Sequence, residues 1–355
     1  MKLRLEPEGI RERIVFTAGL FPRLPMLSLM GTQLSQVIIA GCSLNVFNQM
    51  LDGPQTANAI ADRTSCSQQG MEVLLDSLNG FGILHRRQGL YSLTRETRKW
   101  LTRESSYASS LESIGLNREI GKRFTQLEEC VKTGHVDNIH LSDTNSAWWP
   151  SYLNALKSAG RLSAPRLIKW LKLHNISPKR FLDVGGGPGL TSIALCKEFP
   201  SLAATIIELP SLVKEGTAGI VEANLQDRIR YIEGSALESD FGTGYDLALM
   251  SNFLHVITGV QCREVIQKTY DALAPGGILV IQDTYHPGED GDVPLQTGLA
   301  SLMYYVTAGS RAWPIKTVEK WLREAGFEKT QAEKPKMGIF VAGHKSLGTP
   351  AATQK

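Results

Sequence analysis

The hydrophobic positions of the chain follow two patterns, which divide it into a helical first part and an alternating second part. Over residues 32–101, apolar residues such as Leu34, Val37 and Ile38 recur at intervals of three and four, the spacing of one helix face. From Phe181 onward, short apolar runs alternate with helical stretches, which is typical of a parallel sheet with crossover helices. The pattern therefore predicts an α/β domain preceded by a mostly helical domain.

The first part predicts three helices and a hairpin. One helix ends near Val46, and the next two begin after Thr56 and Ser67, because Thr and Ser are preferred N-cap residues. The runs 83–86 and 91–93 are short, apolar at intervals and separated by a glycine, as in a β-hairpin. Three helices followed by a two-stranded wing predict a winged helix.

The segment before this winged helix is harder to interpret. Pro22 and Pro25 interrupt any long helix, so residues 1–30 predict a short helix, a turn and an entry segment. The apolar stretch 24–40 is interrupted by Gln33, Ser35 and Gln36, and it falls short of the roughly 18 uninterrupted apolar residues of a membrane span. Glutamates stand where the basic region of a signal peptide would lie. We therefore expect no membrane partner.

Charge argues against a nucleic-acid partner for the winged helix. Its third helix, residues 67–79, contains Glu72 and Asp76 but no Lys or Arg. Binding to phosphates requires basic side chains, and only Arg86 and Arg87 in the wing are suitable. The formal net charge is only +3. The helical domain is thus predicted to be an interaction domain.

The length of the chain indicates how many domains it has, and its cysteines indicate the cellular compartment. A chain of 355 residues with 42% hydrophobic and 21% charged residues is typical of about two globular domains. Its five cysteines form no C-x-x-C pair, which favours reduced thiols and a cytoplasmic location. The predicted parts are an N-terminal domain (1–105), a helical linker that contributes to the substrate pocket (106–175), an α/β domain (176–345) and a disordered tail (346–355).

The most informative motif is the glycine-rich turn after the first strand of the α/β domain. Glycine lets main-chain N–H groups approach a ligand, and open α/β sheets bind nucleotides at this strand edge. A dinucleotide loop has glycine at its first, third and sixth positions, whereas Gly185, Gly187 and Gly189 occupy the first, third and fifth. With Asp183 at the strand end and no phosphate-binding Lys-Ser/Thr pair, this favours a cationic adenosyl ligand, S-adenosyl-L-methionine.

The ends of the following strands supply further candidates for cofactor binding. Glu208 closes the second strand, where a carboxylate can accept both ribose hydroxyls of an adenosyl group. An adenine edge is expected near the end of the third strand, and the sulfonium near the end of the fourth. The complete predicted set is Asp183, Gly185, Gly187, Gly189, Glu208, Leu209, Ser235, Ala236, Ser251 and Asn252.

Two residues are candidates for proton transfer. His255 follows the fourth strand and Asp283 the fifth, so both fall on the rim that carries the glycine turn. Histidine can accept a proton near neutral pH, and a carboxylate on its other nitrogen fixes the tautomer. A lone histidine is more often structural, but this placement favours catalysis. The other histidines lack metal-ligand spacing, so no metal is expected.

An aromatic stripe lies between the two domains. Trp148, Tyr152 and Leu156 are four residues apart and share a helix face. Core packing or an interdomain seam is the simpler interpretation. The functional alternative is an apolar wall of a ligand pocket.

These motifs resemble those of the S-adenosylmethionine-dependent small-molecule O-methyltransferases, the group that includes plant caffeate-type and bacterial polyketide-tailoring enzymes. The resemblance covers roughly residues 30–345. It implies a Rossmann-like class I methyltransferase domain preceded by a winged-helix dimerisation domain. The motifs that carry it are Asp183–Gly189, Glu208-Leu209-Pro210, Asn252–His255, Leu273–Gly277, Gly53–Thr56 and Tyr91–Thr94.

The resemblance also implies roles for single residues. His255 is then the general base, Asp283 a flanking acid, and Met303 a pocket methionine, with Trp148, Tyr152 and Leu156 on a helix that contacts the acceptor. Family members are usually intertwined homodimers without a metal. Ala312 stands where a second flanking acid is usual, Ser235 replaces an acidic adenine contact, and Val256–Gly259 replace the sequence Asp-Trp-Ser-Asp.

The sequence therefore predicts methyl transfer to a hydroxyl of a small aromatic or polyketide-like molecule. Because one acid is replaced, two alternatives remain: transfer to carbon or nitrogen on the same fold, and a cofactor-binding protein that no longer transfers methyl. An NAD-dependent dehydrogenase is disfavoured by the glycine spacing.

Overall fold

The computed structural model describes residues 5–7, 9–104, 114–141, 144–146, 148–289, 291–333 and 339–347. The chain divides into two compact units. The first along the chain contains Lys2–Glu119 together with Pro150–Ala155, and the second contains Ile120–Trp149 together with Leu156–Lys355. The domain limits inferred from the sequence stay predictions. Residues 348–355 of the predicted tail lie outside the described residues.

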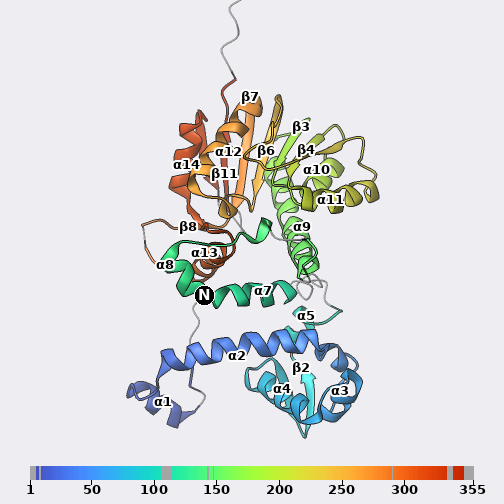
Figure 1. Ribbon diagram of the computed structural model, residues 1–355, viewed down its shortest axis with the longest axis vertical. Coiled ribbons are helices and arrows are strands. Elements are labelled where there is room, and N and C mark those ends of the chain that lie inside the picture. The colour runs from blue at the N-terminus through green and yellow to red at the C-terminus, as the bar shows by residue number, and fades with distance from the viewer. Residues whose placement is uncertain are drawn as a thin grey trace, which may run out of the picture. The chain divides into compact units, whose positions relative to one another are not determined.

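The N-terminal unit contains the three helices and the hairpin predicted for a winged helix (Figure 1). The Thr56 hydroxyl accepts a hydrogen bond from the Ala59 N–H and caps α3, while Ser67 caps α4 in the same way through Gly70. Its elements are α1 (Ile10–Thr17), α2 (Arg23–Ser43), η1 (Phe47–Met50), α3 (Ala57–Thr64), α4 (Gln68–Gly80), β1 (Leu84–Arg87), β2 (Leu90–Leu93) and α5 (Arg95–Trp100).

The interpretation of the two prolines was wrong. Pro22 is the N-cap of α2 and Pro25 lies in its first turn, so a helix of 21 residues begins there. Proline is tolerated in the first turn because those N–H groups have no intrahelical partner. Helix α2 is long and apolar enough to cross a membrane by length and composition alone, and only 11% of its most apolar window is buried. Leu24 and Leu29 are exposed on it.

The second unit is built around a sheet of seven strands in the order β10-β11-β7-β6-β3-β4-β5. Strands β7, β6, β3, β4 and β5 are parallel, which confirms the predicted alternation. Strand β11 pairs antiparallel with β7, and a further strand, β10, occupies the edge. The strands are β3 (Arg180–Val184), β4 (Ala203–Glu208), β5 (Ile229–Glu233), β6 (Tyr245–Ser251), β7 (Leu273–Asp283), β10 (Lys329–Glu333) and β11 (Ile339–His344).

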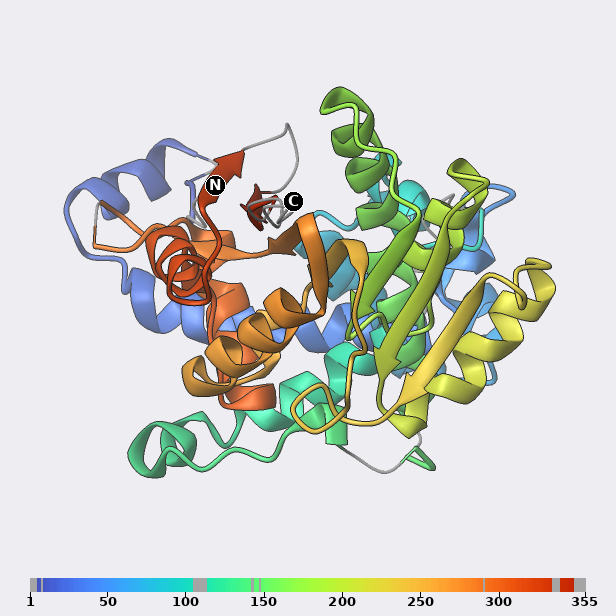
Figure 2. The same ribbon diagram turned by 90° about the horizontal axis from the view of Figure 1, so that it is seen from above.

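Helices cover both faces of this sheet (Figure 2). Consecutive residues of β3 point to opposite faces: Leu182 packs with α12 and α14, and Phe181 packs with α9, α10 and α11. The sheet therefore has one apolar core on each face, and these cores hold its strands in place. The helices are α9 (Trp149–Leu173), α10 (Leu190–Glu198), α11 (Pro210–Glu222), α12 (Gly259–Ala272) and α14 (Ile315–Glu324).

Shorter elements lie around the carboxyl ends of the strands. Helix α13 (Leu295–Ala308) contacts the short turn η3 (Leu254–Val256) and the turn η2 (Ile139–Leu141). The two-residue strands β8 (Tyr285–His286) and β9 (Trp313–Pro314) pair with each other. Two more helices, α7 (Ile114–Phe124) and α8 (Leu127–Thr133), precede η2.

Candidate active site

The glycine turn between β3 and α10 has a backbone that only glycine adopts easily. Gly185, Gly187 and Gly189 have φ angles of 67°, 57° and 74°, in the left-handed region where a Cβ is unfavourable. A Cβ on Gly185 would also lie 2.4 Å from Cδ2 of Phe253. The turn therefore presents bare main chain at the carboxyl edge of the sheet, as the spacing predicted.

Glu208 ties this turn to the next strand. One carboxylate oxygen, Oε2, accepts the Gly187 N–H at 2.7 Å, and the other, Oε1, accepts the Leu209 N–H at 2.7 Å. Burial raises the pKa of Glu208, and the two backbone hydrogen bonds oppose that rise. Each carboxylate oxygen has a second lone pair. The side chain can therefore still accept the hydroxyls of a ribose.

Asp183 lies beneath the turn rather than on its surface. It is buried, and its carboxylate accepts a hydrogen bond of 2.7 Å from the Ser192 hydroxyl at the start of α10. Burial raises the pKa of Asp183 to about 7, whereas the Ser192 hydrogen bond opposes the rise. A Cβ on Gly186 would lie 2.7 Å from its carboxyl carbon. Asp183 thus shapes the turn from below.

Tyr231 on β5 supports the same turn, and sequence analysis missed it. Its hydroxyl donates to the Gly187 carbonyl at 2.9 Å, so both polar groups of residue 187 are held. A Cβ on Gly216 would lie 1.9 Å from that hydroxyl oxygen. The glycine in α11 therefore makes room for the tyrosine. Only the pairing of β5 with β4 brings these residues together.

The remaining predicted cofactor-binding residues lie at neighbouring strand ends. The Gly234 N–H donates to the Glu208 carbonyl at 2.9 Å, which fixes Ser235 and Ala236 beside that strand end. Ser251 ends β6, and the Asn252 N–H donates to the Gln282 carbonyl at 2.8 Å. The strand topology therefore gathers these residues along the edge that carries the glycine turn.

His255 and Asp283 meet as the sequence predicted. His255 Nδ1 lies 2.5 Å from Asp283 Oδ1, and both side chains are almost fully buried. The same carboxylate accepts the N–H groups of Leu254 and Thr284 at 3.1 and 2.7 Å. A carboxylate that accepts three hydrogen bonds holds the proton on Nδ1 of the imidazole. Nε2 is then left with a lone pair that can take a proton.

A tyrosine that the sequence did not reveal covers this histidine. The rings of Tyr304 and His255 stack with centroids 3.6 Å apart and planes 12° apart. The Tyr304 hydroxyl lies 3.1 Å from the Thr284 hydroxyl, and burial raises the pKa of Tyr304 to about 12. Tyr304 follows Met303 on α13, an apolar helix whose pattern does not distinguish this position.

A second histidine lies near the first. Burial, with a smaller electrostatic contribution from His255, lowers the pKa of His140, on η2, to about 4. His140 therefore stays neutral at physiological pH. Ala312, at the position of the second flanking acid, is fully buried, and its N–H donates to the Ser301 hydroxyl. Asp283 is thus the carboxylate that bonds to His255.

The turn η3 is anchored from the segment after α13. The Trp313 indole N–H donates to the Leu254 carbonyl at 3.0 Å, and the Ser310 hydroxyl donates to the Ile257 carbonyl at 2.6 Å. These bonds hold the backbone on both sides of His255. The orientation of the imidazole therefore depends on residues far away in the sequence.

The predicted acceptor residues differ in burial. Tyr152 is buried, while Trp148, Leu156 and Met303 are half-buried. Trp148 packs edge-on against Trp149. Their contact with an acceptor stays a prediction. Over the described part of the chain, no group of three or more His, Cys, Asp or Glu side chains could hold a metal ion, and the expected independence from metal is not tested by that.

The residues at this edge fit an adenosyl cofactor. The glycine turn offers a face free of Cβ atoms, and Glu208 offers acceptor sites for two hydroxyls. Phe253 packs against Gly185, and Phe253 shortly precedes His255 in the sequence. The glycine turn therefore adjoins the backbone segment that carries His255. Cofactor binding and proton transfer can thus occur side by side.

Comparison with known proteins identifies two matching domains. The sequence matches the O-methyltransferase domain over residues 135–328 and the O-methyltransferase dimerisation domain over residues 26–103. The first match alone covers more than half of the chain.

Several characterised proteins are similar over most of the chain. The L-tyrosine C(3)-methyltransferase of Streptomyces lavendulae is 26% identical over 84% of this chain and 85% of its own length. Acetylserotonin O-methyltransferase of Mus musculus is 26% identical, with 86% and 84% covered. The 3-hydroxy-5-methyl-1-naphthoate 3-O-methyltransferase of Streptomyces sahachiroi is 24% identical, with 88% and 92% covered.

Solved structures share the fold. A putative O-methyltransferase from Nostoc punctiforme PCC 73102 superimposes with a TM-score of 0.80 at 26% identity, covering 91% of this chain and 98% of that one. Human N-acetylserotonin methyltransferase in complex with SAM gives a TM-score of 0.73 at 21% identity, with 91% and 97% covered.

Proposed function

The chain belongs to the O-methyltransferase family, and we propose that it methylates a hydroxyl group of a small aromatic or polyketide-like molecule. The cofactor is S-adenosyl-L-methionine, which when bound supplies an electrophilic methyl group on its sulfonium. Relatives that are named for small aromatic acceptors support this acceptor class. The observation that carries the proposal is the 2.5 Å contact between His255 and Asp283 next to the glycine turn.

Each residue of the site has a distinct part in this proposal. Gly185, Gly187 and Gly189 bind the cofactor through their main chain, and Glu208 accepts its ribose hydroxyls. His255 is the general base: Nε2 takes the proton of the acceptor hydroxyl as that oxygen becomes a nucleophile. Asp283 holds the tautomer that leaves Nε2 free, and its charge stabilises the imidazolium that forms.

The expected contributions of proton removal and of alignment to the rate show which one dominates. Proton removal by a positioned base contributes about 10²–10⁴-fold to the rate. Alignment of two bound reactants can contribute more than that, because an effective molarity of roughly 10⁵ M or above is reached in well-oriented reactions. The protein therefore acts first by holding acceptor and cofactor together, and then by removing the proton.

Substitution of the proposed base tests this function. His255→Gln keeps a similar volume but removes the proton acceptor, so kcat with a phenolic acceptor should fall by about 10²–10⁴-fold. The affinity for S-adenosylhomocysteine, measured by calorimetry, should stay within a few-fold of the parent, because the glycine turn is untouched. Near-normal turnover with intact binding would refute the assignment of the base.

Methylation of carbon is the second candidate function. It is favoured by the L-tyrosine C(3)-methyltransferase among the relatives and by Ala312 in place of a second acid. An activated phenol can react at a ring carbon, and His255 would then deprotonate the hydroxyl without that oxygen receiving the methyl group. NMR of the product distinguishes an O-methyl from a C-methyl group directly.

The N-terminal unit points to a homodimer. Residues 26–103 match the dimerisation domain, and large apolar side chains are exposed on α1 and α2, among them Ile10, Ile14 and Leu24. Burial of such surface against a second copy is favourable. Sedimentation analysis of the full chain measures the assembly. A cytoplasmic location and the lack of nucleic-acid or membrane partners stay predictions.

A further inference from the structure

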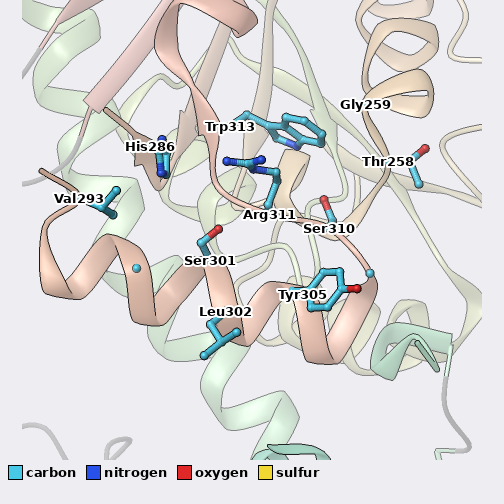
Figure 3. Close-up of a pocket in the computed structure, with 12 residues that line it drawn as sticks. Thr258, Gly259, His286, Val293, Ser301, Leu302, Tyr305, Ser310, Arg311 and Trp313 are labelled. Atoms are coloured by element: carbon cyan, nitrogen blue, oxygen red, sulfur yellow. The ribbon is translucent and has the colours of Figure 1, made fainter. Parts of the chain in front are cut away.

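A cavity of about 530 Å³ lies beside α13, apart from the residues described so far as the reaction centre. That volume falls within the range of small-molecule sites, about 300–1,000 Å³. Neither the glycine turn nor His255, Asp283 or Tyr304 is among the described residues that line it. Its walls come from the start of α12, from β8, from α13 and from the segment 309–313 (Figure 3).

The hydrogen bonds of the lining side chains show what the cavity can still offer. The Tyr305 hydroxyl donates to the Cys130 carbonyl, the Ser310 hydroxyl to the Ile257 carbonyl, and the Trp313 indole N–H to the Leu254 carbonyl. These three donors are therefore committed to the protein. At these positions, the surface that a ligand can still contact is mainly the face of the Trp313 indole ring.

Three other side chains keep donors available. Within the described part of the chain, no hydrogen bond or ion pair involves the Arg311 guanidinium, which Figure 3 shows between His286 and Trp313. The His286 Nδ1 accepts the Gly288 N–H, so the ring proton is on Nε2. The Ser301 oxygen accepts the Ala312 N–H, so its own proton is free to donate.

Chemistry of this kind selects an anion with an apolar body. The described lining contains an arginine, an imidazole and hydroxyls but no Asp or Glu, while Trp313, Leu302 and Val293 supply apolar surface. A guanidinium binds a carboxylate through two parallel hydrogen bonds, and an indole face packs against a planar ring. We propose that this cavity is a second ligand site, which binds a small aromatic carboxylate on Arg311.

The position of the site relates it to the reaction centre. Trp313 and Ser310 line the cavity, and they also hold the two carbonyl groups that flank His255. A carboxylate ligand packed on Trp313 thus contacts the segment that anchors the base without entering the space beside the imidazole.

Calorimetry with 1-naphthoate on the full-length protein, saturated with S-adenosylhomocysteine, tests the site. Arg311→Gln should weaken 1-naphthoate binding by about tenfold or more, because a charge-assisted hydrogen bond is lost. The neutral 1-naphthamide should bind the parent at least tenfold more weakly than 1-naphthoate and should bind Arg311→Gln equally weakly. Inorganic phosphate, which lacks the apolar body, should bind more weakly than 1-naphthoate.

Two control variants separate this proposal from its rivals. Arg323→Gln removes another exposed guanidinium of the same unit, which donates a hydrogen bond to the Thr330 hydroxyl, and it should leave 1-naphthoate binding unchanged. His255→Gln should also leave it unchanged, so the outcome does not depend on the function of the base. Equal binding by the parent and Arg311→Gln, loss of binding in either control, or phosphate binding as tight as that of 1-naphthoate would each overturn the proposal.

Discussion

The two halves of the site are held together by different means. On the cofactor side, the glycine turn is fixed mainly by backbone conformation and by contacts to Glu208 and Tyr231 on the next two strands. On the acceptor side, the imidazole is oriented by side chains from β7, α13 and the segment after it. The cofactor side therefore depends on glycine at particular positions, and the acceptor side depends on the packing of side chains.

This difference determines how each half tolerates change. A left-handed glycine tolerates substitution poorly, because a Cβ there costs about 1–2 kcal/mol before any contact is considered. A stacked or hydrogen-bonded side chain can be replaced by one of similar shape at a cost of about 0.5–1.5 kcal/mol. We therefore expect abrupt losses at the cofactor side and graded losses at the acceptor side.

The largest effect is expected within the glycine turn. Gly185→Ala and Gly187→Ala impose the same left-handed strain, but only at Gly185 does a Cβ also meet Phe253, whereas nothing lies within 4 Å at Gly187. Gly185→Ala should weaken cofactor binding by roughly 10²-fold or more, from strain and overpacking together, and Gly187→Ala by about tenfold. Calorimetry with S-adenosylhomocysteine measures both.

A rescue variant checks the cause of that difference. Phe253→Ala removes the ring that a Cβ on Gly185 would meet, so the double variant with Gly185→Ala should recover most of the difference from Gly187→Ala. Equal losses in the two single variants, or no recovery in the double variant, would show that the Phe253 contact is unimportant.

An intermediate effect is expected at Tyr304. Tyr304→Phe keeps the ring stacked on His255 and loses only the hydroxyl beside Thr284, whereas Tyr304→Leu loses the stack. The Leu variant should lower kcat by roughly 2–10-fold, the value of an aromatic pair, and the Phe variant should lie closer to the parent. Steady-state kinetics at saturating cofactor measures this, and a Phe variant as slow as Leu would contradict the importance of stacking.

The last effect concerns stability rather than binding or turnover, and it is a pH dependence at Asp183. Burial raises the pKa of Asp183 from 3.8 to about 7, so between about pH 4 and 7 the folded state binds more protons than the unfolded state. Stability then falls as the pH rises through that window and levels off above it. Asp183→Asn keeps an acceptor for Ser192 but does not titrate, so Tm of the parent relative to this variant should decrease from pH 4 to 7.

Thermal melts across that range, without cofactor, measure the Asp183 effect. Asp271→Asn, at an exposed carboxylate of α12, is the matched control and should show no comparable slope relative to the parent. A constant difference between the parent and Asp183→Asn over the whole window would contradict a raised pKa.

Local patterns were reliable where local physics decides the structure. The caps Thr56 and Ser67, the parallel strands and the glycine turn were all predicted, since each depends on a few adjacent residues. The long helix α2 was missed because a proline in the first turn looks like a helix breaker. Strand β10 was missed because its residues, Lys329–Glu333, are mostly polar and occupy a sheet edge.

The sequence by itself determined the chemistry of the site. The residue types and spacing of the glycine turn, Glu208, His255 and Asp283 imply an adenosyl cofactor next to a base, because strand ends of a parallel sheet share one edge. Only the tertiary structure decided which side chains surround that chemistry. Tyr231 lies on β5, Tyr304 on α13 and Arg311 after that helix, and no local pattern reveals which groups long-range packing places around them.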